Sequence, residues 1–326
     1  MTHMEATRHV PVLLKEVVDG LALKPGDVVV DATLGGGSHT LALLREVLPE
    51  GQVVSFDMDA QAIDRFLGRI ESDPVAKRAY QDGRLILVHA NFSHLEEELD
   101  RIGIVSAQGI LADLGFSSDQ IESAERGLSF LHDGPLDMRL NRDDPLTAEE
   151  VIRRYSEERL VEIFSLFGDE PKAKRIAWRI ATERKRKPIQ TTSELSRIIE
   201  GIFSAAERRA IGVHPATRVF QALRIEVNRE FERLQAFLPV AADRLSAGGR
   251  LAVISFHSGE DRIVKGFFRS EAKGCICPPN FPECRCGRKP RMKIVTGKPI
   301  EPSADEACQN PRARSGRLRI GEKIGG

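Results

Sequence analysis

The chain of 326 residues is long enough for two domains, or for one domain with a large insertion. No apolar run approaches the length that spans a bilayer, and the first residues lack the basic-then-apolar order of a signal peptide, so we expect a cytoplasmic protein. Five cysteines leave one unpaired and four of them cluster late, which argues against the disulfide framework of a small secreted protein.

The net charge of zero hides an uneven distribution along the chain. Lys and Arg number 10 against 17 Asp and Glu in residues 1–112, but 15 against 6 in residues 262–326. A basic C-terminal part on a neutral protein favours a polyanionic partner, although a solvated surface is the alternative.

The first elements predicted along the chain alternate short apolar strands with helical segments. Strands are expected at 28–31, 53–57, 85–89 and 109–113, and a helix at 60–70. This alternation predicts an α/β fold with a parallel, doubly wound sheet that helices cover on both faces.

The first strand leads into the most informative segment, Asp31–Thr40, whose sequence is DATLGGGSHT. Its glycines allow a sharp turn and a close approach to a ligand, and Ser38 or Thr40 is expected to cap the helix that follows. Asp57 ends the next strand about twenty residues further on, where an acidic side chain accepts ribose hydroxyls. The segment predicts a nucleotide-type cofactor site; the alternative is an ordinary turn with Asp57 as a surface cap.

Side chains that can bind a ligand or take part in a reaction also follow the other predicted strands. They are Phe92, Asp113 and His257. Because ligands of open α/β sheets bind beyond the carboxyl ends of the strands, we expect these side chains to converge on one edge. Phe92 offers a flat face for an adenine. Asp113 and the loop Phe116–Ser118 suit an amino group that is held beside an electrophilic methyl group. The alternatives are that Phe92 is a core aromatic and that Phe116 packs against an inserted domain.

Only helical periodicity is found from about Thr147 to Phe237. Thr147 begins a capping box, and Thr192 or Ser193 is expected to cap another helix. The elements expected beyond this stretch are a strand at 250–256, a helix at 261–268, and short strands at 292–295 and 317–320.

This order of elements predicts two domains. Residues 1–120 and 238–326 are expected to form a discontinuous α/β core, and residues 121–237 an inserted all-helical domain. We interpret the inserted domain as the part that recognises RNA.

A dense group of basic residues lies inside the helical stretch, with only Glu183 to offset it. Such density fits phosphate contacts that position RNA without reading its sequence, and the alternative is a solvated helix face. The group comprises Lys172, Lys174, Arg175, Arg179, Arg184, Lys185, Arg186 and Lys187. A second group near the C-terminus comprises Arg312, Arg314, Arg317 and Arg319.

Four of the cysteines form two pairs, Cys275-x-Cys277 and Cys284-x-Cys286, around a proline-rich loop. Four thiols at short spacing can close a tetrahedral zinc site, but this spacing is less diagnostic than the usual Cys-x-x-Cys. A structural zinc site and a reduced, redox-labile cluster both remain open. A catalytic metal is not expected.

Several longer segments are too specific for a generic α/β protein. They are His9–Leu14 (HVPVLL), Glu125–Phe130 (ERGLSF), Asp133–Arg139 (DGPLDMR), His214–Ile225 (HPATRVFQALRI), Ser255–Ser258 (SFHS), Glu260–Lys265 (EDRIVK) and Asn310–Arg312 (NPR). Together they resemble the RsmH (MraW) family of bacterial ribosomal RNA methyltransferases, and the resemblance runs from His9 to about Ile320.

The resemblance implies a class I, Rossmann-like methyltransferase fold with a helical insertion. It also implies S-adenosylmethionine as the methyl donor and, as the acceptor, the N4 amine of a cytidine in the decoding region of 16S ribosomal RNA in the small subunit. A homodimer is compatible with it. The implied cofactor residues are Gly37, Ser38, His39, Asp57, Phe92, Asp113 and Gln120, and the implied acceptor pocket is formed by Asp113, Ser117, Ser118 and His257.

Four positions depart from the family pattern: Ser38 replaces glycine, Phe116 valine, Asp119 proline and Gly259 leucine. These changes concern details of the acceptor pocket rather than the reaction class. A nicotinamide-dependent oxidoreductase is disfavoured because Thr40 occupies the third glycine position of Gly-x-Gly-x-x-Gly. A non-catalytic ribosome-assembly factor is the alternative function.

Overall fold

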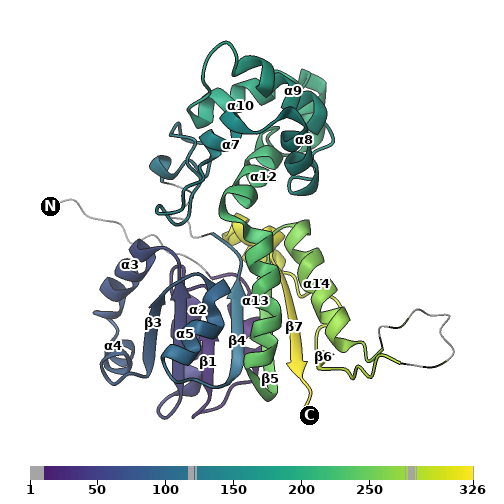
Figure 1. Cartoon of the computed structure of the whole chain (residues 1–326). Helices are drawn as coiled ribbons and strands as arrows, with labels where there is room; N and C mark the ends of the chain where they lie inside the picture. The colour runs from purple at the N-terminus through teal and green to yellow at the C-terminus, as the bar shows by residue number, and fades with distance from the viewer. Residues whose placement is uncertain are drawn as a thin grey trace. The chain divides into compact units, whose positions relative to one another are not determined.

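The computed structural model describes residues 11–116, 121, 123–275, 277, 283 and 285–325. These residues divide into two compact units, which are described separately (Figure 1). The sheet unit comprises Arg8–Gly115 and Phe231–Gly326, and the helical unit contains Phe116–Glu230. Both junctions fall a few residues earlier in the chain than the boundaries expected from the sequence.

In the described residues, seven strands form one sheet with the order β3-β2-β1-β4-β5-β7-β6. Strands β1 to β5 are parallel, whereas β7 runs antiparallel to both β5 and β6. The predicted α/β fold with a parallel sheet is confirmed. The strands are β1 (Val28–Asp31), β2 (Gln52–Asp57), β3 (Leu85–His89), β4 (Ala107–Asp113), β5 (Leu245–Ser255), β6 (Met292–Ile294) and β7 (Arg317–Lys323).

The strands that were easiest to predict are the buried parallel ones. The expected bounds of β1 and β3 are confirmed residue for residue, and β2 and β4 begin only one or two residues earlier than expected. Strand β5 begins at Leu245 rather than at 250, because Leu245 pairs with Ala107 before the register shifts. An irregular register of this kind leaves no clear mark in the pattern of apolar residues.

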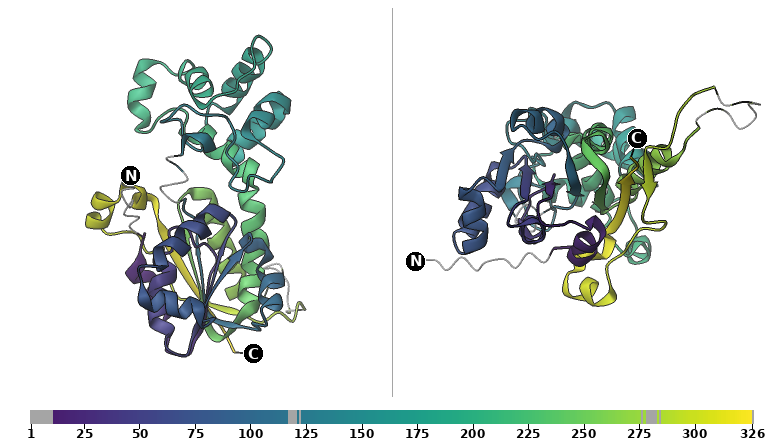
Figure 2. Two further views of the ribbon diagram at one scale, coloured as in Figure 1. Left: turned by 90° about the vertical axis from the view of Figure 1, so that its left-hand side faces the viewer. Right: turned by 90° about the horizontal axis from the view of Figure 1, so that it is seen from below.

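Helices cover both faces of the sheet (Figures 1 and 2). Alternate residues of β1 point to opposite faces, so Val29 and Val30 belong to different apolar clusters. The helices on the Val29 face are α1 (Leu14–Leu21), α2 (Ser38–Val47), α3 (Ala60–Ile70) and α4 (Pro74–Gln81). Those on the Val30 face are α5 (Leu95–Arg101), α13 (Glu230–Arg244) and α14 (Ser258–Ala272).

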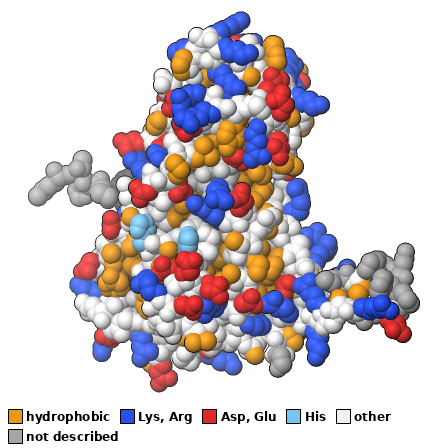
Figure 3. Space-filling view, viewed as in Figure 1, with side chains coloured by type: hydrophobic (Ala, Val, Ile, Leu, Met, Phe, Trp, Pro, Cys, Tyr) orange, Lys and Arg blue, Asp and Glu red, His pale blue; other side chains and the backbone are white. Residues whose placement is uncertain are grey.

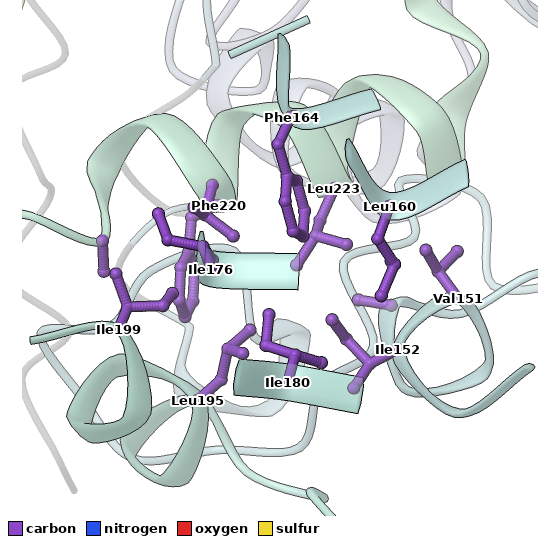
Figure 4. Close-up of a cluster of buried hydrophobic side chains, with 14 of the residues drawn as sticks. Val151, Ile152, Leu160, Phe164, Ile176, Ile180, Leu195, Ile199, Phe220 and Leu223 are labelled. Atoms are coloured by element: carbon purple, nitrogen blue, oxygen red, sulfur yellow. The ribbon is translucent and has the colours of Figure 1, made fainter. Parts of the chain in front are cut away.

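The helical unit has an apolar core of its own. Figure 4 shows side chains from α7, α8, α9, α10 and α12 pointing toward one another. Pairs spaced four residues apart, such as Leu160 with Phe164 and Ile176 with Ile180, place one face of each helix in this core. The helices of this unit are α7 (Ala148–Arg154), α8 (Glu157–Leu166), α9 (Ala173–Glu183), α10 (Thr192–Glu200), α11 (Ala205–Ile211) and α12 (Thr217–Asn228).

The two predicted helix caps in this unit have different outcomes. The Thr147 hydroxyl accepts a hydrogen bond from the Glu150 backbone N–H at 3.2 Å, as expected. The cap of α10 is Thr191, in a capping box with Glu194, so the prediction of Thr192 or Ser193 is wrong. The Thr192 hydroxyl instead donates to the His132 carbonyl at 3.0 Å, a long-range partner that the local sequence does not reveal.

The C-terminal part adds short elements to the sheet unit: α15 (Ala304–Gln309) and a 3₁₀ turn at Pro311–Ser315. The Glu306 carboxylate of α15 accepts the Leu13 backbone N–H at 2.7 Å, which ties this segment to the start of α1. Among the described residues, none of the helices combines the length and the hydropathy that a membrane crossing requires.

Candidate functional site

The candidate site lies at the carboxyl edge of the sheet, where three neighbouring strands end on carboxylates. Asp31, Asp57 and Asp113 are the last residues of β1, β2 and β4, and β1 lies between the other two. Phe92 and His257 follow the ends of β3 and β5. The chain order of the strands reverses between β1 and β4, which is where ligands of open α/β sheets bind.

The turn after β1 depends on glycine. Gly35 and Gly37 have φ angles of 51° and 74°. A Cβ atom added to Gly37 would lie 2.1 Å from the ring of Phe66 on α3, so no side chain fits at this position. The turn is therefore packed directly against α3, and this packing fixes its conformation.

Asp57 holds this turn through its carboxylate. One oxygen accepts the Gly35 backbone N–H at 2.9 Å, and the other accepts the Asp59 N–H at 2.8 Å. Burial raises the pKa of Asp57 to about 6, against the opposing effect of these hydrogen bonds. Because a carboxylate offers about four lone-pair sites, two remain for further donors.

Asp31 lies beneath the turn and is fully buried. It accepts hydrogen bonds from the Thr40 hydroxyl at 2.7 Å and the Thr33 backbone N–H at 3.1 Å. The Thr33 hydroxyl in turn accepts the Asp113 backbone N–H at 2.7 Å, which links β1 to β4. Burial raises the pKa of Asp31 to about 7. The bracing role of Asp31 was not predicted from the sequence, where its only local signal is the pair of threonines Thr33 and Thr40.

The predicted capping of α2 by Ser38 or Thr40 is wrong. The N-cap position is Gly37 and has no side-chain cap, because the Thr40 hydroxyl is engaged by Asp31. Ser38 is the first helical residue, and its hydroxyl accepts a hydrogen bond from Arg69 of α3 at 3.2 Å. A side chain is therefore accommodated at position 38, where the related family has glycine.

His39 and Asp113 face each other across the rim, with His39 Nδ1 3.7 Å from a carboxylate oxygen of Asp113. Burial lowers the pKa of His39, so the ring is neutral near pH 7, although the Asp113 charge opposes this shift. The other ring nitrogen, Nε2, lies 3.1 Å from the Val12 carbonyl, which can only accept, so Nε2 carries the proton. Nδ1 therefore presents a lone pair toward the carboxylate.

Phe92 lies in a short 3₁₀ turn after β3, where Asn91 caps the turn by accepting the Ser93 N–H at 2.9 Å. Its half-buried ring meets Phe237 of α13 edge-on, with the ring centroids 5.1 Å apart. The ring is thus held against the apolar core while the residue stays partly accessible.

His257 has a structural role in the sheet unit. Its Nδ1 accepts the Glu260 backbone N–H at 3.4 Å and so caps α14. Its Nε2 lies 3.0 Å from a Glu260 carboxylate oxygen, yet makes no hydrogen bond among the described residues. At Gly259 a Cβ atom would come within 2.3 Å of the Phe231 ring, so any side chain there would require this ring to move.

Phe116 contacts the helical unit to which it belongs. The guanidinium carbon of Arg224 lies 4.0 Å from the centre of its ring, and Arg224 is held by two contacts to Glu230, at 3.0 and 3.2 Å. One face of the ring is therefore occupied. The remaining predicted residues of this segment, Ser117, Ser118, Asp119 and Gln120, lie outside the described residues.

The basic cluster of the helical unit is more strongly offset than its sequence indicates. Lys172 pairs with Glu207 at 2.6 Å and Lys187 with Glu194 at 2.6 Å, so Glu183 is not the only counter-charge. In Figure 3, Lys and Arg side chains on the visible face alternate with Asp and Glu. Within the described part of the chain, Lys174 and Arg175 are exposed and form no ion pair.

The second basic group is only partly available to a ligand. Arg319 is buried and makes two hydrogen bonds to Asp261, at 2.7 and 3.1 Å. Arg319 is therefore not available to a phosphate, since this side chain holds β7 against α14. Arg317 lies 3.6 Å from the same carboxylate but is more exposed.

The sheet order, the glycine turn after β1 and the acidic residue ending β2 define a Rossmann-like α/β fold with a nucleotide-type ligand edge. The sequence model of the MraW methylase family matches residues 6–324. The chain therefore belongs to the MraW methylase family and is a methyltransferase.

Two relatives are similar over nearly their whole length. A protein of Thermomicrobium roseum is 46% identical, covering 98% of this chain and 94% of that protein. One of Desulforapulum autotrophicum is 45% identical, covering 97% and 99%. Both are named "Ribosomal RNA small subunit methyltransferase H". Among solved structures, a putative rRNA methylase from Clostridium thermocellum has a TM-score of 0.45 and 14% identity, over 97% of this chain and 99% of that one.

Proposed function

We propose that this chain transfers a methyl group from S-adenosylmethionine to the N4 amine of cytidine 1402 of 16S ribosomal RNA, in the cytoplasm. The observation that carries the proposal is the edge formed by the glycine turn, Asp57 and Asp113. Two relatives at 45–46% identity whose names state small-subunit ribosomal RNA methylation support the class of substrate. The position and the N4 chemistry rest on the resemblance of the motifs to the RsmH family.

The residues of the turn fit the nucleoside part of the donor. Asp57 keeps acceptor capacity for two ribose hydroxyls after binding Gly35 and Asp59. Gly35 brings its backbone N–H to within 2.9 Å of this carboxylate, and Gly37 keeps the turn packed against Phe66. Phe92, held in place by its contact with Phe237 and partly accessible, is assigned to stacking on the adenine.

The pair His39 and Asp113 fits the amino-acid end of the donor. Both groups present acceptor lone pairs 3.7 Å apart, an arrangement that a ligand with several N–H donors stabilises. An α-ammonium group has three such donors and a positive charge. The neutral imidazole of His39 is kept in the accepting tautomer by Val12.

When bound, the donor supplies a methyl group on a cationic sulfur: the N4 lone pair forms the new C–N bond, the C–S electron pair stays on sulfur, and N4 loses a proton. The exocyclic amine is a weak nucleophile because its lone pair is delocalised into the ring. The protein therefore contributes alignment and electrostatics rather than a strong base. We assign Asp113 to orienting the amine by accepting one of its N–H groups, with Ser117, Ser118 and His257 as further acceptor-pocket residues.

The helical unit supplies the RNA contacts in this proposal. Trp178 on α9 is 53% exposed, and Lys174 and Arg175 occupy the same exposed part of the helix. An exposed aromatic ring among cations can stack on a splayed base while the cations contact phosphates. Phe116, with Arg224 on one of its faces, offers the other face to a base. The target base must leave its stack to reach a donor held at a sheet edge.

The test is methylation of small subunits isolated from cells that lack the native activity, followed by mass spectrometry of the nucleosides. We expect N4-methylcytidine, whereas C5-methylcytidine would contradict the chemistry. Asp57→Ala should weaken donor binding about 10- to 100-fold, because charge-assisted hydrogen bonds are worth roughly 1.5–3 kcal/mol. Asp82→Ala, which removes an exposed carboxylate at the end of α4, is the matched control.

The role of Asp113 is tested separately. Asp113→Ala should lower methyl transfer more than it lowers donor affinity. Full transfer with unchanged donor binding would show that the assignment of Asp113 is wrong. Tight RNA binding by the wild-type chain without any methylation would instead support the assembly-factor alternative.

A further inference from the structure

Three thiols lie close together in the segment between α14 and β6. The Sγ atoms of Cys275, Cys277 and Cys286 all lie within 4.8 Å of one another. Those of Cys275 and Cys286 are 3.8 Å apart. A tetrahedral site with zinc–sulfur bonds of about 2.3 Å places its sulfur atoms about 3.8 Å apart. A disulfide would require about 2.0 Å, so these two sulfur atoms are not bonded to each other. The 3.8 Å spacing is that of a hydrogen bond from the Cys286 thiol to Cys275, and it also fits two neighbouring metal ligands.

The surroundings of these thiols are polar and positively charged. The Cys277 backbone N–H donates a hydrogen bond to the Cys275 sulfur at 3.4 Å. Lys273, Arg285 and Lys289 are exposed side chains of the same segment. A Zn²⁺ ion with three thiolates carries one net negative charge, which these cations offset.

The segment has little else to hold it. None of the described residues between Lys273 and Arg291 is buried, so no apolar core forms there. Its C-terminal end is tied down by Arg288, which pairs with Glu271 of α14 at 2.6 Å, and by Arg291, which pairs with Asp243. A segment without a core is the usual setting for a structural metal, whose binding energy replaces apolar burial.

We propose that Cys275, Cys277 and Cys286 bind a structural zinc ion that fixes this basic segment. Binding forms three zinc–sulfur bonds and releases the thiol protons. Cys284, which completes the sequence pair Cys284-x-Cys286, lies outside the described residues, and the proposal stands on the three thiols that are described. The site is independent of the carboxyl edge and of the methyl-transfer reaction proposed for it.

The test begins with the full-length protein, purified under reducing conditions without chelators and analysed for metals by mass spectrometry. We expect about one zinc ion per chain in the wild type and in Cys308→Ser, and less than about one tenth of that in the double variant Cys275→Ser/Cys286→Ser. Cys308 is the matched control because it is exposed on α15, outside the cluster. Circular dichroism and binding of S-adenosylhomocysteine show whether the double variant is folded.

Cobalt provides a second measurement that does not depend on a variant. Wild-type protein freed of metal and loaded with Co²⁺ should show the intense visible bands of a tetrahedral cobalt–thiolate site, and added zinc should remove them. Chelation should also increase the number of thiols that react with a disulfide reagent. Wild-type protein that contains no zinc and takes up neither zinc nor cobalt would overturn the proposal, as would equal zinc in the wild type and a folded double variant.

Discussion

The two units of this molecule hold their charged groups in opposite ways. In the sheet unit, Asp31 is fully buried and its pKa is raised to about 7. In the helical unit, Glu207 is at the surface, and its pKa is lowered to about 2 by hydrogen bonds from Lys172 and Ser204. Buried carboxylates reduce stability but set a binding edge in advance, whereas surface ion pairs add little stability and are screened by salt. The contrast teaches that the sheet unit buries carboxylates to preset an edge, whereas the helical unit keeps its charged groups in solvent.

The largest expected effect concerns what stabilises the helical unit. If its apolar core rather than its surface charge does so, Phe164→Ala should cost about 3–5 kcal/mol of unfolding free energy, because Phe164 is fully buried. Leu166→Ala, in the same helix but 57% exposed, should cost less than about 0.5 kcal/mol. Urea denaturation followed by circular dichroism measures both. Equal costs for the two variants would break the comparison between the units.

The second prediction uses the pH dependence of stability. The pKa of Asp31 is raised from 3.8 to about 7, so the folded state retains a proton that the unfolded state has lost between these values. The protonated Asp31 carboxyl therefore contributes to the stability of the folded state. This contribution is present in full below about pH 4 and is lost as the pH rises to 7, at roughly 1.4 kcal/mol per pKa unit. The stability of the wild type relative to Asp31→Asn should therefore fall by roughly 3–4 kcal/mol between pH 4 and pH 7.

Asp261 gives the matched case of opposite sign. Burial would raise the pKa of Asp261, but the hydrogen bonds and charge of Arg319 outweigh burial and lower it. Its contribution is present above the unfolded pKa of 3.8 and is lost as the pH falls below that value. Relative to Asp261→Asn, the wild type should thus lose stability toward acid. Parallel pH profiles for the Asp31 and Asp261 variants would refute both assignments.

The third prediction tests whether the glycine turn at the binding edge has its conformation before a ligand binds. Gly37→Ala combines a positive φ angle with a collision at Phe66, and we expect it to cost about 2–3 kcal/mol and to weaken donor binding. Gly83→Ala has a similar φ of 72° but no atom within 4 Å, so only the backbone cost of about 1 kcal/mol applies. Thermal denaturation and calorimetric titration with S-adenosylhomocysteine separate the two variants. A turn that yields to the methyl group would make Gly37→Ala as mild as Gly83→Ala.

The contrast between the two units also explains which features could be predicted from the sequence. Strands β1 and β3 were predicted to the residue because parallel strands covered by helices on both faces form short apolar runs. The edge residues Asp57 and Asp113 were found because each directly ends such a strand. The bracing of Asp31 was not predicted, since its meaning depends on a hydrogen bond from Thr40 across the turn.

Charge counts along the chain did not predict which basic residues are paired, because their acidic partners lie far away in the sequence. Lys172 and Glu207 are 35 residues apart, and Arg319 and Asp261 are 58 apart. Local density therefore identified a basic cluster but could not tell which of its members are already paired. Pairing between residues that are far apart in the sequence depends on the fold, so local patterns of residues do not predict it.

The smallest expected effect tests which cations of the helical unit meet RNA. Lys174 and Arg175 form no ion pair among the described residues, so the double variant Lys174→Ser/Arg175→Ser should lose phosphate contacts without leaving an unpaired carboxylate. The slope of log binding constant against log salt should become shallower by about one to two, with a modest loss of affinity at low salt. Lys77→Ser, in α4 of the sheet unit, is the control and should leave the slope unchanged.

Filter binding of a 16S ribosomal RNA fragment across a salt series measures these slopes. If the double variant keeps the wild-type slope while Lys77→Ser changes it, the RNA contacts belong to the sheet unit. There would then be no division of labour between the units, because the preset edge for the donor and the electrostatic contact with RNA would lie in the same unit. If the slope changes only in the Lys174→Ser/Arg175→Ser variant, the helical unit, whose charges are solvated, is the unit that contacts the RNA.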